Sequence, residues 1–362
     1  MTTLMRAPCF CSLESKILVL IAFIPSIFIQ PLFTQPTINS FIPASGAVGT
    51  TVMITGTNFS ALPSDNIVYF GATAAAVTSA TSTLLTLIVP PGSTFQPISV
   101  TTNGLTAYSN NPFIVTFGAS CPTAPPAFTK ISTLSTNSYP RHIVSNDIDG
   151  DGRPDLVVTN HLASGFSVFR NTGGNGTIAF ASPLNFISGT EPFATAIGDL
   201  NGDGKHDVVT HSYPGNALHI FINASTPGII AFASKIDIPA GLNPIFMAIA
   251  DLDKDGKPEI LAVNNNGNSV SVFKNTTNAA ISFAPKVDFP IGKYPGNLFV
   301  VDFDGDGYSD VAAVNFDDNT VSVLRNTSTN TNLSFASKKD YSTGVNPFWV
   351  TAGDLDNDSK RK

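Results

Sequence analysis

Residues 147–155 read DIDGDGRPD, and the same pattern returns three more times along the chain. The copies are 199–207 (DLNGDGKHD), 251–259 (DLDKDGKPE) and 302–310 (DFDGDGYSD), which begin 52, 52 and 51 residues apart. We refer to these stretches as loops 1 to 4, and to a further copy that opens at residue 354 (DLDNDSKRK) as loop 5. Self-similarity at a fixed period is typical of repeat architectures. The acidic pattern therefore predicts an array of similar structural units.

Each unit contains short runs that favour β-strands. In the second unit these runs are 193–197, 207–210, 218–222 and 230–238, and Gly, Asn, Asp and Pro separate them. No stripe with a helical period accompanies them. Four strands in about 50 residues indicate a propeller blade, since the rungs of a β-solenoid are shorter. We predict an all-β chain in which residues 128–362 form four complete four-stranded blades plus a partial fifth, an incomplete ring.

The acids of each loop stand where an oxygen-ligated cation would need them. Carboxylates, or one amide, occupy the first, third and fifth positions, Gly occupies the sixth, and a fourth carboxylate occupies the ninth. Alternate residues of a tight loop converge on one point, and Ca²⁺ takes about six to eight oxygen ligands. Gly allows the positive φ of the turn, and position seven would offer its backbone carbonyl. The predicted calcium ligands are Asp147, Asp149, Asp151, Arg153 and Asp155; Asp199, Asn201, Asp203, Lys205 and Asp207; Asp251, Asp253, Asp255, Lys257 and Glu259; and Asp302, Asp304, Asp306, Tyr308 and Asp310.

Two other structures share part of this pattern. An EF-hand begins in the same way but needs Glu at position 12 between two helices, whereas position 12 here lies inside an expected strand and is never Glu. An Asp-Gly turn without an ion is the second alternative, and four copies in register disfavour it. We expect about four Ca²⁺ sites. Loop 5 is defective as a site because Asp354, Asp356 and Asp358 are followed by Ser359 in place of Gly and by Lys362 in place of the ninth acid.

These loops resemble the FG-GAP/VCBS repeat family, whose calcium-loop propellers also occur in the heads of integrin α-chains. The resemblance covers about residues 128–362 and implies a propeller with Ca²⁺ in hairpin loops. It implies that the acids at positions one, three, five and nine are the ligands, with Asn201 replacing one acid in loop 2. The F-G and G-A-P consensus words are not clear in this chain, so ligand binding of the integrin type is not carried over.

The chain before the repeats divides into three segments. An apolar run of signal-peptide length at 17–29 follows Lys16, so we assign 1–35 to a signal peptide, with a retained membrane anchor as the alternative. Residues 36–117 contain short strand-like runs and resemble the IPT/TIG family through PASG at 43–46 and TGTNF at 55–59. The resemblance implies an immunoglobulin-like β-sandwich. Residues 118–127 (GASCPTAPPA) have the composition of a stiff linker.

Composition excludes some functions. There are 19 basic and 26 acidic residues, a net charge of −7, and no basic face that could neutralise the phosphates of a nucleic acid. No motif of a hydrolase, metalloprotease, P-loop or dinucleotide-binding enzyme is present, so we predict no catalytic residues and no enzyme activity. A zinc site at His206, His211 and His219 is a weak alternative to surface histidines. The Asn residues at 171, 223, 275 and 326 are interpreted as cross-blade hydrogen-bonding residues or as ligand contacts.

The functional prediction combines these features. We expect a secreted or cell-surface calcium-binding β-propeller that acts as a non-catalytic adhesion or ligand-binding module. Its partner would be an extracellular protein or glycan, with no nucleic acid and no membrane span after signal cleavage. Two alternatives remain open: a lectin-like carbohydrate-binding propeller, and an accessory domain of an extracellular polysaccharide-degrading enzyme. A spacer that binds nothing is a third.

Overall fold

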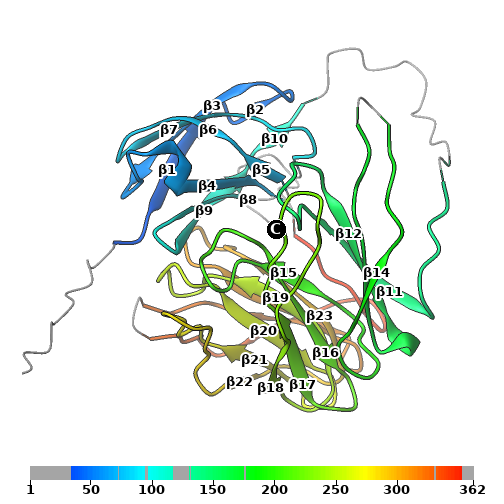
Figure 1. Cartoon of the computed structure of the whole chain (residues 1–362). Helices are drawn as coiled ribbons and strands as arrows, with labels where there is room; N and C mark the ends of the chain where they lie inside the picture. Colours follow the sequence, from blue (N-terminus) through cyan, green and yellow to red (C-terminus); the bar gives the residue numbers. More distant parts are fainter. Residues whose placement is uncertain are drawn as a thin grey trace, which may run out of the picture. The chain divides into compact units, whose positions relative to one another are not determined.

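The fold is described from a computed structural model that covers residues 34–71, 73–93, 97–116, 130, 132–174, 177–329 and 332–352. The expected linker, loop 5 and all but the last two residues of the expected signal peptide lie outside these ranges. Over the described ranges, the chain from Thr34 onward belongs to one compact unit. Its regular structure is almost wholly β (Figure 1), which confirms the all-β prediction. Within the described ranges no helix has the length and apolar character needed to cross a bilayer.

Residues 37–115 form a β-sandwich (blue to cyan in Figure 1). Two four-stranded sheets share one core, in which Val52 and Ile54 from one sheet pack with Val68 and Phe70 from the other. Alternate residues of each strand point into this core, as expected for strands with one buried face. The first sheet has the order β1 (Thr37–Ile42), β3 (Thr51–Thr57), β7 (Leu84–Ile88) and β6 (Val77–Ala80); the second has β5 (Thr73–Ala75), β4 (Asn66–Phe70), β8 (Pro97–Thr102) and β9 (Leu105–Pro112); and β2 (Ser45–Gly46) pairs in parallel with β10 (Ile114–Val115). A short 3₁₀ turn, η1 (Pro63–Asp65), precedes β4.

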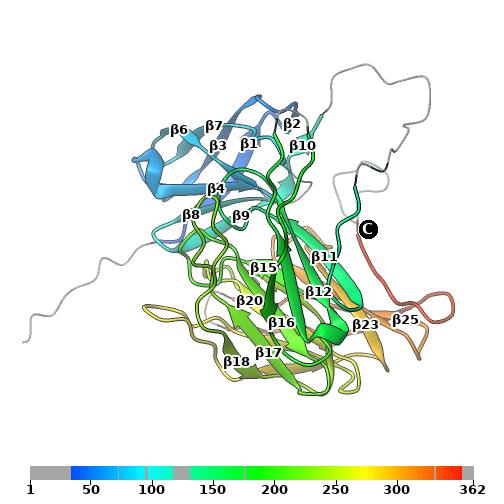
Figure 2. The same ribbon diagram turned by 45° about the vertical axis from the view of Figure 1, so that its right-hand side comes forward.

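Four four-stranded antiparallel sheets follow, one for each repeat, which confirms the four predicted blades (Figure 2, green to orange). In every blade the strands pair in chain order, so each blade is a simple meander. Blade 1 also contains the 3₁₀ turn η2 (His161–Ala163). The strands are β11 (Pro140–Asn146), β12 (Asp155–Asn160), β13 (Gly165–Phe169) and β14 (Leu184–Ile187) in blade 1; β15 (Ala196–Gly198), β16 (Asp207–Ser212), β17 (Ala217–Phe221) and β18 (Ile236–Pro239) in blade 2; β19 (Pro244–Ala250), β20 (Glu259–Asn264), β21 (Ser269–Phe273) and β22 (Val287–Pro290) in blade 3; and β23 (Pro295–Val301), β24 (Asp310–Asn315), β25 (Thr320–Leu324) and β26 (Lys339–Ser342) in blade 4.

Two strands of blade 2 begin more than two residues away from the expected start. The first strand is limited to Ala196–Gly198, because the backbone N–H groups of Phe193 and Ala194 donate to the ring of His211. The fourth strand begins only at Ile236, since the chain before it forms an isolated bridge between Asn223 and Phe232. The expectation of a single strand over 230–238 was therefore wrong in its first half.

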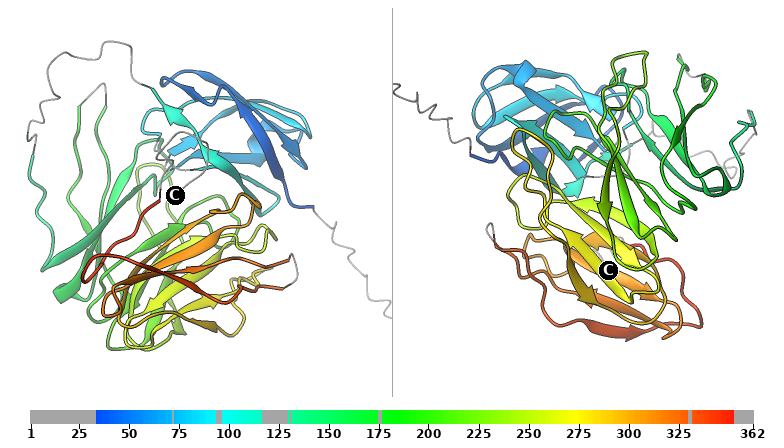
Figure 3. Two further views of the ribbon diagram at one scale, coloured as in Figure 1. Left: turned by 180° about the vertical axis from the view of Figure 1, so that it is seen from behind. Right: turned by 60° about the horizontal axis from the view of Figure 1, so that its bottom comes forward.

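Neighbouring blades share apolar cores. One cluster joins blades 1 and 2, a second joins blades 2 and 3, and a third joins blades 3 and 4. The first strands of blades 2, 3 and 4 lie side by side, β15 against β19 and β19 against β23 (Figure 3). Burial of each large apolar side chain contributes about 1.5–3 kcal/mol, so stacking of blades is the main source of their stability.

The start of a fifth repeat lies against blade 4. The side-chain amide of Asn297 in β23 exchanges two hydrogen bonds with the backbone of Val350, at 2.7 and 3.3 Å. The residues described after β26, 343–352, contain no strand. The start of the predicted partial fifth unit thus lies beside β23, and it forms no sheet over the described residues.

Candidate metal-binding loops

Each of loops 1 to 4 joins the first and second strands of its blade, so the acids sit in a β-hairpin as the sequence predicted. The sixth-position glycines adopt φ values of +79° to +88°. An L-residue is strained in this region, so Gly is required to bring the chain round toward its own first residue. In loop 3 the fourth position also has a positive φ, and there the residue is Lys254, at +59°.

The first-position carboxylate organises the turn. In loop 1, Asp147 accepts hydrogen bonds from the backbone N–H groups of Asp151 (3.0 Å) and Gly152 (2.9 Å). The first acids of the other three loops likewise accept from the N–H of the sixth-position Gly, at 2.8–3.1 Å. These donors hold the carboxylate oxygens toward the inside of the loop, where a cation would lie.

The ninth-position carboxylate has a role that the sequence did not reveal. In blade 1, Asp155 accepts from the N–H of Ile148 at 3.0 Å and from that of Asn171 at 2.7 Å, one bond on each oxygen. The same pair of bonds occurs at Asp207, Glu259 and Asp310. The ninth acid therefore ties the start of the loop to the end of the third strand, and only its remaining lone pairs are free for a metal.

Three of the loops bring three carboxylates together. In each group one oxygen of every acid lies within 4.8 Å of the others. The groups are Asp147, Asp149 and Asp155 in loop 1; Asp251, Asp253 and Asp255 in loop 3; and Asp302, Asp304 and Asp306 in loop 4. In the described part of the chain, loop 2 contains no such group of three acids. It is also the loop that has an amide, Asn201, at position three.

Position seven keeps its side chain away from the centre of two loops. Lys205 donates to the carbonyl of Ser225 at 2.9 Å, and the ring of Tyr308 lies 4.3 Å from the ammonium of Lys254. Arg153 instead pairs with Asp151 of its own loop. The variety of these side chains agrees with a position that contributes its backbone rather than its side chain.

Burial and crowding perturb the acids. Burial raises the pKa of Asp147 to about 6 and that of Asp251 to about 7, and neighbouring carboxylates add to both shifts. Burial likewise raises the pKa of Glu259 to about 9. By contrast, a hydrogen bond from Arg325 lowers the pKa of the exposed Asp304. Most of these carboxylates are thus held in surroundings where a proton or a cation is needed to offset their charge.

The donor set fits Ca²⁺. The ligands are carboxylate, amide and carbonyl oxygens, which a hard cation prefers to nitrogen or sulfur. One of them, the Oδ1 of Asp251, is buried without any hydrogen-bond partner. A bound cation would satisfy this atom and would offset the repulsion among the acids.

Three of the four Asn residues that follow the third strands, Asn223, Asn275 and Asn326, join neighbouring blades, in agreement with one of the two sequence interpretations, whereas Asn171 bonds only within blade 1. The amide of Asn223 donates to the carbonyl of His206 in its own blade (2.9 Å) and to that of Ile148 in loop 1 (2.8 Å). Asn275 and Asn326 repeat this arrangement toward loops 2 and 3. Each of loops 1 to 3 is therefore fastened to the blade that follows it.

The zinc alternative is not supported. His211 accepts hydrogen bonds through Nε2 from the backbone of Phe193 and Ala194, and His219 pairs with Asp237 at 2.7 Å. His206 hydrogen-bonds Asn146 and packs on the ring of Tyr69. Over the ranges that the structure covers, metal-competent groups of three occur in the Asp loops and involve no His.

An aromatic belt, which the sequence analysis missed, crosses the blades at the strand ends opposite the loops. Rings from consecutive repeats follow one another with centroids 4.6–6.3 Å apart, and the Tyr213 hydroxyl bridges to Asn265 at 3.3 Å. The guanidinium of Arg141 lies over two of these rings at 4.8 and 4.9 Å. A signal was present in the sequence, because Tyr139 and Tyr294 stand three repeat periods apart, as do Phe193 and Phe348. The belt consists of Tyr139, His161, Phe193, Tyr213, Tyr294, Phe316 and Phe348.

The sandwich contacts the loop end of blades 2 and 3. Tyr69 donates its hydroxyl proton to the carbonyl of Gly204 in loop 2 at 3.0 Å, and the backbone N–H of Thr106 donates to Gly256 of loop 3, also at 3.0 Å. The amide of Gln35 donates to Asp251 at 3.0 Å. These contacts place the sandwich on two of the candidate metal loops.

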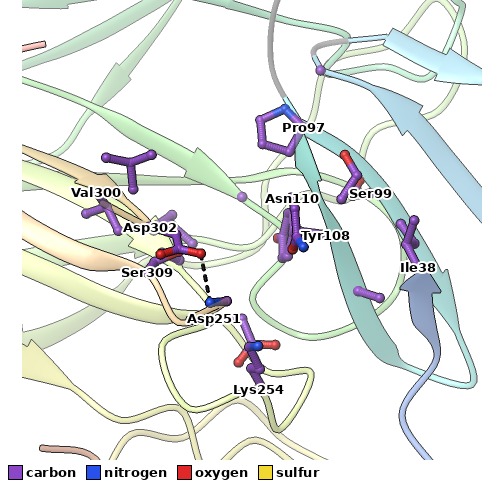
Figure 4. A pocket seen from close by; sticks show the side chains of 18 of the residues that line it. Ile38, Pro97, Ser99, Tyr108, Asn110, Asp251, Lys254, Val300, Asp302 and Ser309 are labelled. Atoms are coloured by element: carbon purple, nitrogen blue, oxygen red, sulfur yellow. Dashed lines mark hydrogen bonds between the residues drawn. The ribbon is translucent and has the colours of Figure 1, made fainter. Parts of the chain in front are cut away.

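A cavity of about 550 Å³ lies beside these contacts. Figure 4 shows side chains of the sandwich, including Tyr108 and Asn110, facing Asp251, Lys254 and Asp302 across it. The lining mixes hydroxyl, amide and charged groups with apolar walls, and its volume lies within the range of small-molecule sites.

Family models match most of the chain. The FG-GAP-like repeat matches residues 147–210, 199–262, 251–313 and 302–361, and the IPT/TIG domain matches residues 36–115. None of the curated proteins matches the chain significantly.

Among solved structures, a protein from Lactobacillus plantarum is 15% identical with a TM-score of 0.44, over 84% of this chain and 85% of that one. An auxiliary nutrient binding protein from Bacteroides thetaiotaomicron is 11% identical with a TM-score of 0.30, over 83% and 85%. Likenesses at this level do not define a shared activity. The repeat matches and the four hairpin loops show that the chain belongs to the FG-GAP-like repeat family, with an IPT/TIG domain ahead of the repeats.

Proposed function

We propose that this protein is a secreted or cell-surface, calcium-binding propeller that binds an extracellular protein or glycan without catalysis. In this proposal calcium has a structural role. It binds to the acids of loops 1, 3 and 4, and in loop 2 the amide of Asn201 serves as one of its ligands. The convergence of three carboxylates in three loops supports that part. A chain without a recognisable catalytic motif, built from repeated hairpins, suits recognition rather than turnover.

The aromatic belt is the observation that carries the binding function. Tyr139, Tyr294 and Phe348 are exposed by 53%, 41% and 52%, although they belong to different repeats. Clustered exposed rings on a soluble protein mark an interaction surface, and aromatic residues with one polar end are favoured there. The IPT/TIG domain contacts the loop end of blades 2 and 3, so the belt end is the one that we assign to the ligand.

Binding to a glycan array and to surfaces coated with fibronectin or collagen tests this assignment. We expect the wild-type chain to bind at least one of these probes. A Tyr139→Ala, Phe348→Ala double variant should lose at least about ten-fold in affinity, because about 1.4 kcal/mol of contact is then missing. Tyr341→Ala is the matched control, since Tyr341 is 48% exposed but lies in β26, outside the belt.

Three results would contradict the proposal. The first is a chain that binds none of the probes. The second is binding that the belt variant leaves unchanged, and the third is hydrolysis of a bound polysaccharide by the isolated chain. Calcium binding is measured separately by calorimetry, so failure of the metal role and failure of the belt are distinguished.

The cavity supports a second candidate, recognition of a small hydroxylated molecule such as a sugar. Its lining offers the carboxylate of Asp251, the amide of Asn110 and the ammonium of Lys254 to hydroxyl groups, with the ring of Tyr108 as an apolar wall. Asn110→Leu should then abolish binding of mono- and disaccharides while the belt variant retains it. Saccharide binding that Asn110→Leu leaves unchanged and that the belt variant abolishes would reject this candidate.

A further inference from the structure

The residue just before the cross-blade Asn carries a positive charge in three of the four blades. It is Arg170 in blade 1, Lys274 in blade 3 and Arg325 in blade 4, whereas blade 2 has Ile222. This residue stands at the end of the third strand, next to the N–H that the ninth-position acid binds. The residue at this position therefore stands beside the Asp loop of its own blade.

In the three blades with a base, this side chain lies on the acids of the loop. The ammonium of Lys274 hydrogen-bonds Asp253 and lies 3.7 Å from Asp255. The acids contacted are those at the third and fifth positions, which are predicted metal ligands. Asp253 is fully buried and the side chain of Lys274 is 27% exposed, so water screens this pair only in part.

The other two bases contact the same positions less intimately. Arg325 places Nε 2.5 Å from Asp304 and Nη2 3.4 Å from Asp306, but its side chain is 59% exposed. Arg170 lies 3.9 Å from Asp151, which Arg153 also contacts. We expect the Lys274 pair to be the strongest of the three, because its acid is the most deeply buried.

Loop 2 lacks this arrangement. Ile222 cannot neutralise an acid, and the nearby Lys205 donates to the carbonyl of Ser225 instead. No ion pair to Asp199, Asp203 or Asp207 occurs among the described residues. Three of the four loops thus have a basic side chain of the protein beside their acids, and loop 2 has none among the described residues.

We propose that Arg170, Lys274 and Arg325 are tethered counter-cations of loops 1, 3 and 4, which hold the acids in place without calcium and compete with it, whereas loop 2 depends on metal. This inference rests on the proposed calcium function. A cation beside the acids offsets their mutual repulsion in the metal-free chain. The same charge repels an incoming Ca²⁺, so it lowers the calcium affinity of its loop. Stability without metal and affinity for metal therefore change in opposite directions.

Lys274→Met in the full chain tests the strongest pair, since Met keeps most of the length and removes the charge. Titration calorimetry with CaCl₂ should show that the affinity of one site rises by at least about five-fold. The melting temperature in calcium-free buffer should fall. Lys274→Arg should restore both values toward wild type, because the charge returns.

Ile222→Lys is the reciprocal variant, because it places a base at the equivalent position of loop 2. One site should then bind calcium more weakly, and the calcium-free melting temperature should rise. Asp251→Asn supplies the background control: with loop 3 weakened as a site, Lys274→Met should no longer raise the affinity of any site.

A fall in both melting temperature and affinity for Lys274→Met would make Lys274 a structural partner alone and would overturn the proposal. Unchanged affinity would overturn it as well. If the wild-type chain binds no calcium, the metal part of the proposed function fails. Opposite shifts of the calcium-free melting temperature in Lys274→Met and Ile222→Lys would even then support the counter-cation role.

Discussion

The side-chain amide that follows the third strand performs two tasks at once in blades 2, 3 and 4. Its two N–H groups reach carbonyls in its own blade and in the loop of the previous blade, so one residue closes a hairpin and joins two blades. Asn275 and Asn223 are almost fully buried. Water therefore cannot replace the amide if it is removed.

Replacement of this amide should destabilise the fold by an amount that depends on its blade. Asn275→Ala leaves the carbonyls of Leu200 and Pro258 without their donor, and we expect a loss of about 2–4 kcal/mol in the free energy of unfolding. Asn171→Ala is the matched control, because the amide of Asn171 donates only within blade 1 and the residue is less buried. Denaturant unfolding compares the two, and an equal loss would show that the cross-blade bond contributes nothing.

His211 should make the fold sensitive to acid. Its ring is fully buried and its Nε2 accepts two backbone hydrogen bonds, so it must be neutral. Burial, with a smaller effect of His219, lowers the pKa of His211 to about 3, against about 6.5 in an unfolded chain. A lowered folded-state pKa means that protons favour the unfolded chain. The stabilisation is complete above about pH 6.5 and is lost at about 1.4 kcal/mol for each pH unit below it.

Denaturant unfolding between pH 7 and pH 4 checks this dependence. His211→Gln retains an acceptor for the two N–H groups and does not titrate. As the pH is lowered below about 6.5, the free energy of unfolding of the wild-type chain should fall by about 1.4 kcal/mol per pH unit more than that of the variant. Equal slopes would show that His211 is not held neutral by the fold.

At the scale of the element, the hairpin loop is a unit that the sequence predicted well. The 52-residue period, the Gly at position six and the acids at alternate positions are local features, so they identified the blades, the hairpins and three clusters of carboxylates. The two hydrogen bonds of Asp155 and its equivalents were not predicted. One of them involves the N–H of a residue 16 positions away, and only folding brings that group to the loop.

Calcium removal should weaken the propeller, most strongly at alkaline pH. Burial raises the pKa of Asp155 and Asp251 to about 7, above the value of an unfolded Asp. A raised folded-state pKa stabilises the fold at low pH, and this contribution is lost as the pH rises through about 7. Calcium replaces the protons, and each site at a hundred-fold excess over its Kd adds about 2.7 kcal/mol.

Calorimetric melting at pH 5 and pH 8 tests the exchange of protons for calcium. In calcium-free buffer the melting temperature should be lower at pH 8 than at pH 5. Saturating calcium should raise it at both pH values and most at pH 8. An identical pH profile with and without calcium would contradict a metal role for these acids.

At the scale of the whole molecule, the sequence predicted the segments but not their contacts. The IPT/TIG sandwich and the repeats each carry a local signature, and both were confirmed by structure and by family matches. The belt that Tyr139 and Phe348 share, and the contact of Tyr69 with loop 2, join residues more than a hundred positions apart. The belt positions recur with the repeat, but only the folded chain shows which rings touch and where the sandwich meets the loops.

The sandwich lies against loops 2 and 3, which are candidate metal sites. Tyr69 is buried against loop 2, where it bonds to Gly204 and packs on the tilted ring of His206 with ring centroids 4.1 Å apart. Burial raises the pKa of its hydroxyl, and the acids of loops 1 and 2 add to the shift, so the group stays protonated as a donor. A ligand that orders loop 2 therefore also orders the surface on which the sandwich rests, and the coupling is reciprocal.

Removal of this ring should loosen loop 2 specifically. In Tyr69→Ala, backbone amides of residues 199–207 should exchange with deuterium at least about ten-fold faster, because a contact worth more than about 1.4 kcal/mol is lost. Loop 4 has none of the hydrogen bonds that join the sandwich to loops 2 and 3, so residues 302–310 serve as the internal control. Ile88→Ala is the matched variant, since Ile88 is a sandwich residue that is 46% exposed. Faster exchange in both loops would indicate general destabilisation, whereas a change confined to loop 2 and reduced by calcium would establish that sandwich docking and metal loading share one hairpin.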